Sequence, residues 1–165
     1  MPKKIAKRPR KPAALASTPQ SLVPHLKLRT VRVVESRSKL TLVNNKFPDN
    51  LQVSADVAIG VSDDRTHLLG SVTATVQSPE AAEPQSNIEI MVTVQCIFDS
   101  PPLPDMPLVS DDEKQSINAT VMLIAWPYVR QHVHAATASM AIPPFTVPLF
   151  QVGAVTIHAR RDIKQ

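Results

Sequence analysis

Glycine is scarce in this sequence, and its scarcity excludes several kinds of binding site. The chain of 165 residues contains three glycines, Gly60, Gly70 and Gly153. Phosphate-binding loops and dinucleotide-binding turns need several glycines within a few residues, because the backbone must approach the phosphate closely. The glycines here are far apart, so a glycine-rich nucleotide cradle is excluded.

Cysteine is scarcer still, and long apolar runs are missing. Cys96 is the single cysteine, so no disulfide can form within the chain, which favours a reducing compartment. No apolar run approaches the roughly 20 residues of a membrane-spanning helix. The apolar residues 13–16 that follow the basic start are too few for the core of a signal peptide. We therefore expect a cytoplasmic protein without a membrane span.

Positive charge is concentrated at the start of the chain. Six of the 18 Lys and Arg residues lie in the first eleven positions: Lys3, Lys4, Lys7, Arg8, Arg10 and Lys11. The rest of the chain has 12 basic residues against 14 acidic ones. Interleaved prolines predict a disordered, solvated tail over residues 1–22, followed by a single domain over residues 23–160. A nucleic-acid-binding arm is the alternative reading of this tail, and it is not favoured because the remaining chain has no positive excess.

Four segments of the chain alternate between apolar and polar residues, as half-buried strands do. They cover residues 26–42, 51–61, 68–76 and 88–98. In the first, the apolar positions are even-numbered, and a polar stretch over residues 35–39 predicts a bend. Turn residues 62–65 predict a tight hairpin between the second and third strands. Four consecutive strands predict an antiparallel meander with one buried face.

A long helix should follow, and its start is the best-marked boundary in the sequence. Residues 110–113, Ser-Asp-Asp-Glu, form a capping box with three acids. Apolar residues then recur at spacings of four and three, and Ile124 and Tyr128 widen this stripe enough to invite self-association. Pro127 should kink or break the helix. The predicted fold is α+β, with the four-stranded antiparallel sheet packed against this helix, a proline-rich crossover over residues 99–108 and a short C-terminal element.

No set of residues in the sequence has the pattern of a catalytic or metal site. His132 and His134 are two apart on the predicted helix, about 200° around its axis, and cannot share one metal ion. Cys96 lies on the apolar side of a strand, as a buried structural thiol does. A turn explains the acidic pair at 63–64 and a helix cap explains the pair at 111–112. We expect no enzyme activity, no metal and no cofactor.

The apolar, proline-spaced segment Ile142–Phe150 has the pattern of a binding surface. Its prolines fix φ, so the intervening side chains would lose little conformational entropy on binding. Burial in the core is the alternative reading, above all for Trp126. The sequence predicts a peptide-binding surface that consists of Trp126, Tyr128, Ile142, Phe145, Leu149 and Phe150.

The order of elements and two motifs resemble the SecB family of export chaperones. Residues 126–130, Trp-Pro-Tyr-Val-Arg, stand where the family has a motif of the type Phe-Pro-Tyr-Ala-Arg, and residues 140–145 are similar to the segment before its second helix. The resemblance implies an ATP-independent holdase for non-native or presecretory polypeptides in protein export. It also implies a homotetramer, a dimer of dimers with the main helices at the central interface, here Met122, Val129, Val133 and Ala136.

Two departures from the SecB pattern concern its partner, the SecA-type translocation ATPase. Lys39, Val43 and Met91 occupy sheet positions where SecA-binding members carry acids, and residues 160–165 are not an acidic tail. These departures weaken the expectation of SecA as a partner. The chain is also similar to divergent SecB-like chaperones, some of which serve one client, such as the antitoxin of a toxin–antitoxin module, and this alternative stays open.

Overall fold

Four strands and one long helix make up the part of the chain that the computed structural model describes, residues 21–44, 47–48, 51–79, 86–103, 109–142 and 145–148. A short 3-10 turn, η1, precedes the first strand. The elements are η1 (Val23–His25), β1 (Lys27–Thr41), β2 (Gln52–Val61), β3 (His67–Gln77), β4 (Asn87–Asp99) and α1 (Asp111–Ser139). The predicted tail falls almost entirely outside the described residues, as do residues 149–165.

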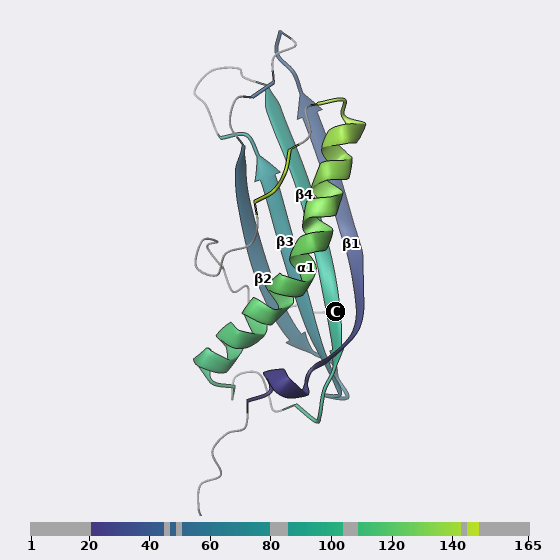
Figure 1. Ribbon diagram of the computed structural model, residues 1–165, viewed down its shortest axis with the longest axis vertical. Coiled ribbons are helices and arrows are strands. Elements are labelled where there is room, and N and C mark those ends of the chain that lie inside the picture. The colour runs from purple at the N-terminus through teal and green to yellow at the C-terminus, as the bar shows by residue number, and fades with distance from the viewer. Residues whose placement is uncertain are drawn as a thin grey trace, which may run out of the picture.

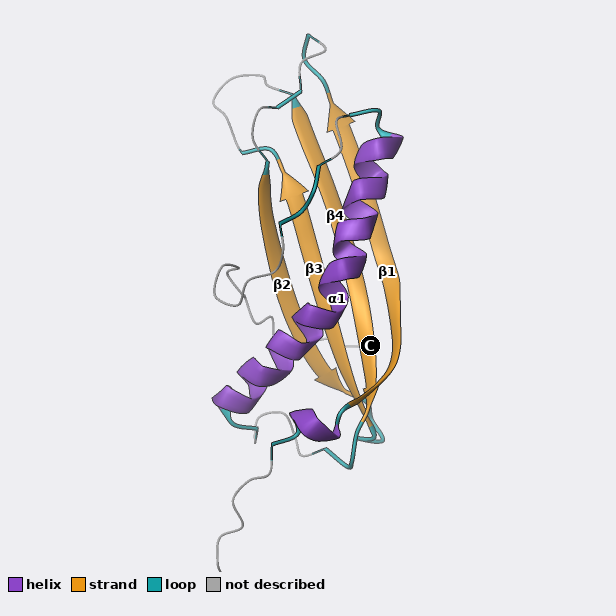
Figure 2. Ribbon diagram, in the orientation of Figure 1, coloured by secondary structure: helices purple, strands orange, loops and turns teal. Residues whose placement is uncertain are grey.

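The sheet and the helix form two layers. The strands make one antiparallel sheet in the order β1-β4-β3-β2, and α1 crosses one face of it diagonally (Figure 1). η1 lies near the N-terminal end of α1 on the same side of the sheet (Figure 2). The predicted α+β fold, a four-stranded antiparallel sheet packed against a long helix, is confirmed.

The place of β1 differs from the expected meander. β2, β3 and β4 follow one another as a meander, but β1 pairs with β4 and has no pairing with β2. This is a Greek-key order, in which a longer connection, here residues 42–51, carries the chain to the far side of the sheet. β4 is apolar at every second position and needs neighbours on both sides, whereas the charged β1 suits an edge.

Two irregularities in β1 also change which of its residues face α1. The register with β4 shifts between Leu28 and Thr30 and again between Val33 and Glu35. Each shift inserts an extra residue and reverses the alternation of side chains. Val31 and Val33 therefore pack against the core, while Val34, expected inside by its even number, is 49% exposed.

The core lies between α1 and the facing side of the other three strands. The apolar positions predicted from alternation in these strands are confirmed, and the helical stripe covers them. Buried residues of the strands are Ala55, Val57, Leu68, Val72, Ala74, Val76, Ile88, Ile90, Val92, Val94, Cys96 and Phe98, and those of the helix include Ile117, Val121, Met122, Ala125, Trp126, Val129 and Val133.

Both ends of α1 are secured by identifiable contacts. The Ser110 hydroxyl accepts a hydrogen bond from the backbone N–H of Glu113 at 3.2 Å, as the capping box predicts. The Glu113 carboxylate does not return to its own cap. It accepts instead from the backbone N–H groups of Leu22 at 2.5 Å and Val23 at 3.2 Å, and so ties η1 to the helix. At the other end Ala141 takes φ 55°, the left-handed conformation that often ends a helix.

Pro127 does not break α1, which continues to Ser139. Figure 1 shows the helix changing direction near its middle. Pro127 and Leu123 are both exposed, so the carbonyl that loses its partner faces solvent and water can satisfy it. The expected interruption is therefore a bend within one continuous helix.

At Gly70 in β3 the helix packs tightly against the sheet. A Cβ atom built at this position would lie 2.4 Å from Cγ2 and 2.7 Å from Cγ1 of Val121. Since real carbon atoms do not approach so closely, the absence of a side chain at Gly70 lets α1 settle onto the sheet.

Gly70→Ala should therefore destabilise the protein, by about 1–3 kcal/mol, because the added methyl group overpacks the interface with Val121. Denaturant unfolding measures the difference. Gly60→Ala is the matched control, since a Cβ at Gly60 meets nothing within 4 Å. A Gly70→Ala protein as stable as the control would contradict this account of the contact.

Candidate peptide-binding site

The residues after α1 return along the helix as an extended strap, defined here as residues 145–148 (Figure 1). Two side chains of α1 hold its backbone. The indole N–H of Trp126 donates to the carbonyl of Pro148 at 2.8 Å, and Nε of Arg130 donates to the carbonyl of Val147 at 3.0 Å. Val147 is fully buried. The strap is thus an extended segment fixed to the helix rather than a loose loop.

The structure places the predicted peptide-binding residues at different depths. Trp126 and Ile142 are 5% and 6% exposed. Their side chains belong to the core, which was the alternative to an exposed binding surface. Phe145 is half-buried and packs against the core from the strap. Tyr128 is 41% exposed. Leu149 and Phe150 lie outside the described residues.

Tyr128 lies on the other side of α1 from the strap contacts. It is two residues from both Trp126 and Arg130, about 200° around the helix axis. Ile124 is its neighbour one turn earlier in α1. Pro127 directly precedes it, and Leu123, which is 57% exposed, lies one turn before Pro127. We call these four residues the outer patch. Sequence reasoning missed Leu123, although its spacing of four from Pro127 places both on one face.

The residues predicted to form an oligomer interface face the sheet instead. Met122, Val129 and Val133 are fully buried within the single chain, and Ala136 is half-buried. Their side chains already contact the core, because the stripe that they share is the one that covers β3 and β4. A second copy could contact this part of α1 through exposed side chains, such as those of the outer patch.

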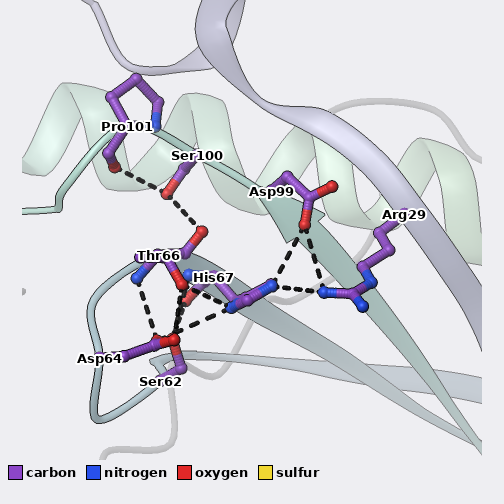
Figure 3. Close-up of polar contacts among 8 residues, drawn as sticks. All are labelled: Arg29, Ser62, Asp64, Thr66, His67, Asp99, Ser100 and Pro101. Carbon is purple, nitrogen blue, oxygen red and sulfur yellow. Dashed lines mark hydrogen bonds and ion pairs between the residues drawn. The ribbon is translucent and has the colours of Figure 1, made fainter.

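A polar network joins the β2–β3 hairpin to the start of β1 (Figure 3). The Asp64 carboxylate accepts from the hydroxyl groups of Ser62 at 2.5 Å and Thr66 at 2.7 Å. These hydrogen bonds, that of Ser62 first, hold the pKa of Asp64 well below its usual range. His67 lies between Thr66 on one side and Arg29 and Asp99 on the other. The sequence predicted the turn but not its link to β1.

The network brings hydroxyl, imidazole, guanidinium and carboxylate groups together at the hairpin. Nη1 of Arg29 lies 2.6 Å from Nε2 of His67, and Oδ1 of Asp99 lies 3.2 Å from the same nitrogen. Nδ1 of His67 is 2.8 Å from the Thr66 hydroxyl. The hydrogen bonds stabilise the hairpin.

The described part of the chain contains no group of three or more His, Cys, Asp or Glu residues that could hold a metal ion. Within the same ranges, no helix is both long enough and apolar enough to cross a membrane.

Comparisons with known proteins identify the fold. No protein-family profile matches the chain, and a search of the curated proteins found no match by sequence. Among solved structures, the chain is similar to that of a SecB-like chaperone, Rv1957 of Mycobacterium tuberculosis, in complex with a ChAD peptide from the Rv1956 HigA1 antitoxin. The TM-score is 0.58 and the identity 14%, over 78% of this chain and 90% of the other.

A second structure, a protein of unknown function from Streptococcus agalactiae, matches with a TM-score of 0.39 and 13% identity, over 75% of this chain and 97% of the other. The first structure, with its TM-score of 0.58, shows that this chain has a SecB-like fold. At this level of identity the likeness defines the fold of this chain and not its activity.

Cys96 behaves as a buried structural thiol. Its side chain is fully buried in β4, and burial raises the pKa of the thiol to about 11 from the ordinary 9.0. The protonated thiol is thus favoured by folding, so its contribution to stability is present below pH 9.0 and is lost as pH rises toward 11.

We expect the folded protein to react with a thiol reagent about a hundredfold more slowly than the unfolded chain, because the thiolate fraction falls tenfold for each unit of pKa. The rate of colour release from an aromatic disulfide reagent at pH 8, with and without denaturant, measures this ratio. In denaturant melts, the loss of stability above pH 9 should be smaller in Cys96→Ala. Equal rates in the two states would show that the thiol is accessible.

Proposed function

We propose that this protein is an ATP-independent chaperone that holds non-native polypeptide segments beside the strap. The observation that carries the proposal is the pair of bonds from Trp126 and Arg130 to the strap carbonyls. They keep an extended segment at the surface of the helix layer instead of letting it collapse, and proline at 148 stiffens it further.

The main chain of the strap supports this proposal. No backbone-to-backbone hydrogen bond joins residues 145–148 to another described residue. The carbonyls of Val147 and Pro148 are taken by Arg130 and Trp126, so it is Phe145 and Thr146 that can offer main-chain N–H and C=O groups to an extended client. Half-buried Phe145 adds an apolar contact of low specificity. Main-chain pairing with apolar contacts suits recognition of many sequences. Leu149 and Phe150, which follow the strap, remain predicted members of the site.

The likeness of fold to a SecB-like chaperone also supports a peptide-binding role. General protein export and a single dedicated client are both compatible with the strap. The dedicated client, an antitoxin, is favoured by the antitoxin peptide bound to the structural neighbour and by the basic Lys39 and apolar Met91 on the sheet. Chains that co-purify from the native cell would distinguish one small partner from many presecretory ones.

The holdase activity has a direct test. The protein at a stoichiometric amount should suppress the light scattering of an aggregating unfolded client without any nucleotide. Phe145→Asp should weaken suppression by about tenfold in effective concentration, because it places a charge against the apolar segment. Phe145→Leu, which keeps an apolar side chain, is the matched control. No suppression at severalfold excess of the wild-type protein would refute the holdase.

We also propose that the outer patch joins copies of the chain, in line with a homotetrameric cytoplasmic chaperone. Leu123 and Tyr128 are large exposed side chains at the two borders of the outer patch, and exposed apolar patches commonly mark an interface. The substitution pair Leu123→Lys and Tyr128→Lys should lower the mass measured by light scattering after size exclusion. Gln115→Lys, at an exposed position of α1 about two turns before Leu123, should not. An unchanged mass in the double variant would exclude the outer patch.

A further inference from the structure

The face of the sheet turned away from α1 carries a hollow of about 630 Å³. It lies where the β2–β3 hairpin, the end of β4 and the start of β1 meet. Leu69 of β3 and Ile97 of β4, which are paired in the sheet, give it an apolar floor, and Arg29 and Arg32 of β1 line one side. This volume falls within the usual range of ligand sites, roughly 300–1,000 Å³.

Gly60 keeps the hollow open at the β2 side. It is opposite Leu69 in the register of β2 and β3, and a Cβ atom added there would meet nothing within 4 Å. The φ angle of Gly60 is not in the left-handed region, so any residue can adopt its backbone. Gly60 is therefore required neither by a turn nor by a close contact within the chain. Its lack of a side chain leaves space above the apolar floor of the hollow.

The β1 side of the hollow presents positive charge that is held in place. Arg32 donates from Nε at 2.9 Å and from Nη2 at 2.7 Å to the side-chain oxygen of Gln95. Gln95 is neutral, so within the described ranges no carboxylate neutralises Arg32. Arg29 is fixed by His67 at 2.6 Å and lies 3.6 Å from Asp99. A pre-positioned guanidinium group is suited to a carboxylate.

The charged residues around the hollow determine which kind of anion it can bind. Asp63 lines the opposite side of the hollow, and Asp64 beside it stays ionised because its pKa is lowered. These carboxylates would repel a polyanion such as nucleic acid. The chain's own undescribed ends do not fit either. Residues 1–20 carry six basic and no acidic side chains, and the single acid of residues 149–165, Asp162, is surrounded by Arg160, Arg161 and Lys164, which Arg29 and Arg32 would repel. A separate partner with an isolated acidic residue is the complementary occupant.

We propose that this hollow binds a partner polypeptide through a short segment in which an Asp or Glu is flanked by an aliphatic residue. The carboxylate binds Arg32 next to Arg29, and the aliphatic side chain covers Leu69 and Ile97. This site is on the opposite face from the strap and is independent of the holdase. It would let the chaperone recognise one partner while the α1 side holds a client.

A capped tripeptide, acetyl-Leu-Glu-Leu-amide, is the probe for a titration followed by amide NMR shifts of the labelled full-length protein. We expect saturable shifts confined to residues 29–32, 60–63, 67–69 and 95–97. The peptide with Gln in place of Glu should bind about tenfold more weakly, as should the probe to Arg32→Met, because one charge-assisted contact is lost.

Gly60→Val tests the same site by filling it. Valine is compatible with a strand and meets no neighbour at its Cβ, so the fold should be kept, as circular dichroism can verify, while probe binding is lost. Arg37→Met is the matched control, since Arg37 is on β1 and pairs with Glu35 outside the hollow, and it should leave the affinity unchanged.

Three results would overturn the proposal: no saturable shift with the probe, equal affinity for the Glu and Gln peptides, or tighter binding of a short single-stranded oligonucleotide to the same residues. None of these measurements depends on aggregation suppression. A failed holdase with an intact peptide site, or the reverse, would therefore be recognisable.

Discussion

The packing of one helix against a wider sheet determines the rest of this structure. A single helix about 10 Å across cannot cover four strands spaced by almost 5 Å, so α1 crosses the sheet diagonally and reaches all four strands. The missing side chain at Gly70 leaves room for Val121 of α1. What the helix leaves uncovered on its own side must be covered by other parts of the chain. η1 does this near the N-terminal end of α1, and the strap does it beside the middle of the helix.

The strap helps to cover the core as well as forming the proposed client-binding site. Val147 fills the apolar space beside α1, and the hydrogen bonds from Trp126 and Arg130 hold the chain there. The same position leaves the outward edge of an extended, proline-stiffened backbone at the surface. A segment that covers the core while part of its main chain makes no backbone-to-backbone hydrogen bond within the described residues is prone to pair with another extended chain. The covering role and the proposed client-binding role therefore follow from one geometry.

The fold could be predicted from the sequence wherever one element has one clear period. The alternation in residues 51–61, 68–76 and 88–98 and the capping box at Ser110 gave the right elements, because each pattern reflects burial of a single face. β1 shows the limit. Its register shifts at Leu28 and Val33 reverse the alternation, and its pairing with β4 depends on contacts far apart in sequence.

The candidate site was predicted less well for a related reason. Trp126 and Tyr128 are neighbours in sequence but are on opposite sides of a helix, so one meets the strap and the core while the other is exposed. The hollow on the open sheet face could not be found from the sequence at all, since Arg32, Leu69 and Ile97 come from three strands. Only the register of those strands brings them together.

The two faces of the sheet differ in the kind of recognition that they can support. On the α1 side, contacts are apolar or involve the main chain, and such contacts discriminate little between sequences. On the open side, Arg29 is positioned by His67 and Asp99, and Arg32 by Gln95. Positioned charges reject any partner that leaves them unpaired, so they discriminate strongly. A protein that holds varied unfolded segments and also binds one particular partner needs both kinds of surface. A sheet with a helix on one face only provides both surfaces, on opposite faces, within one domain.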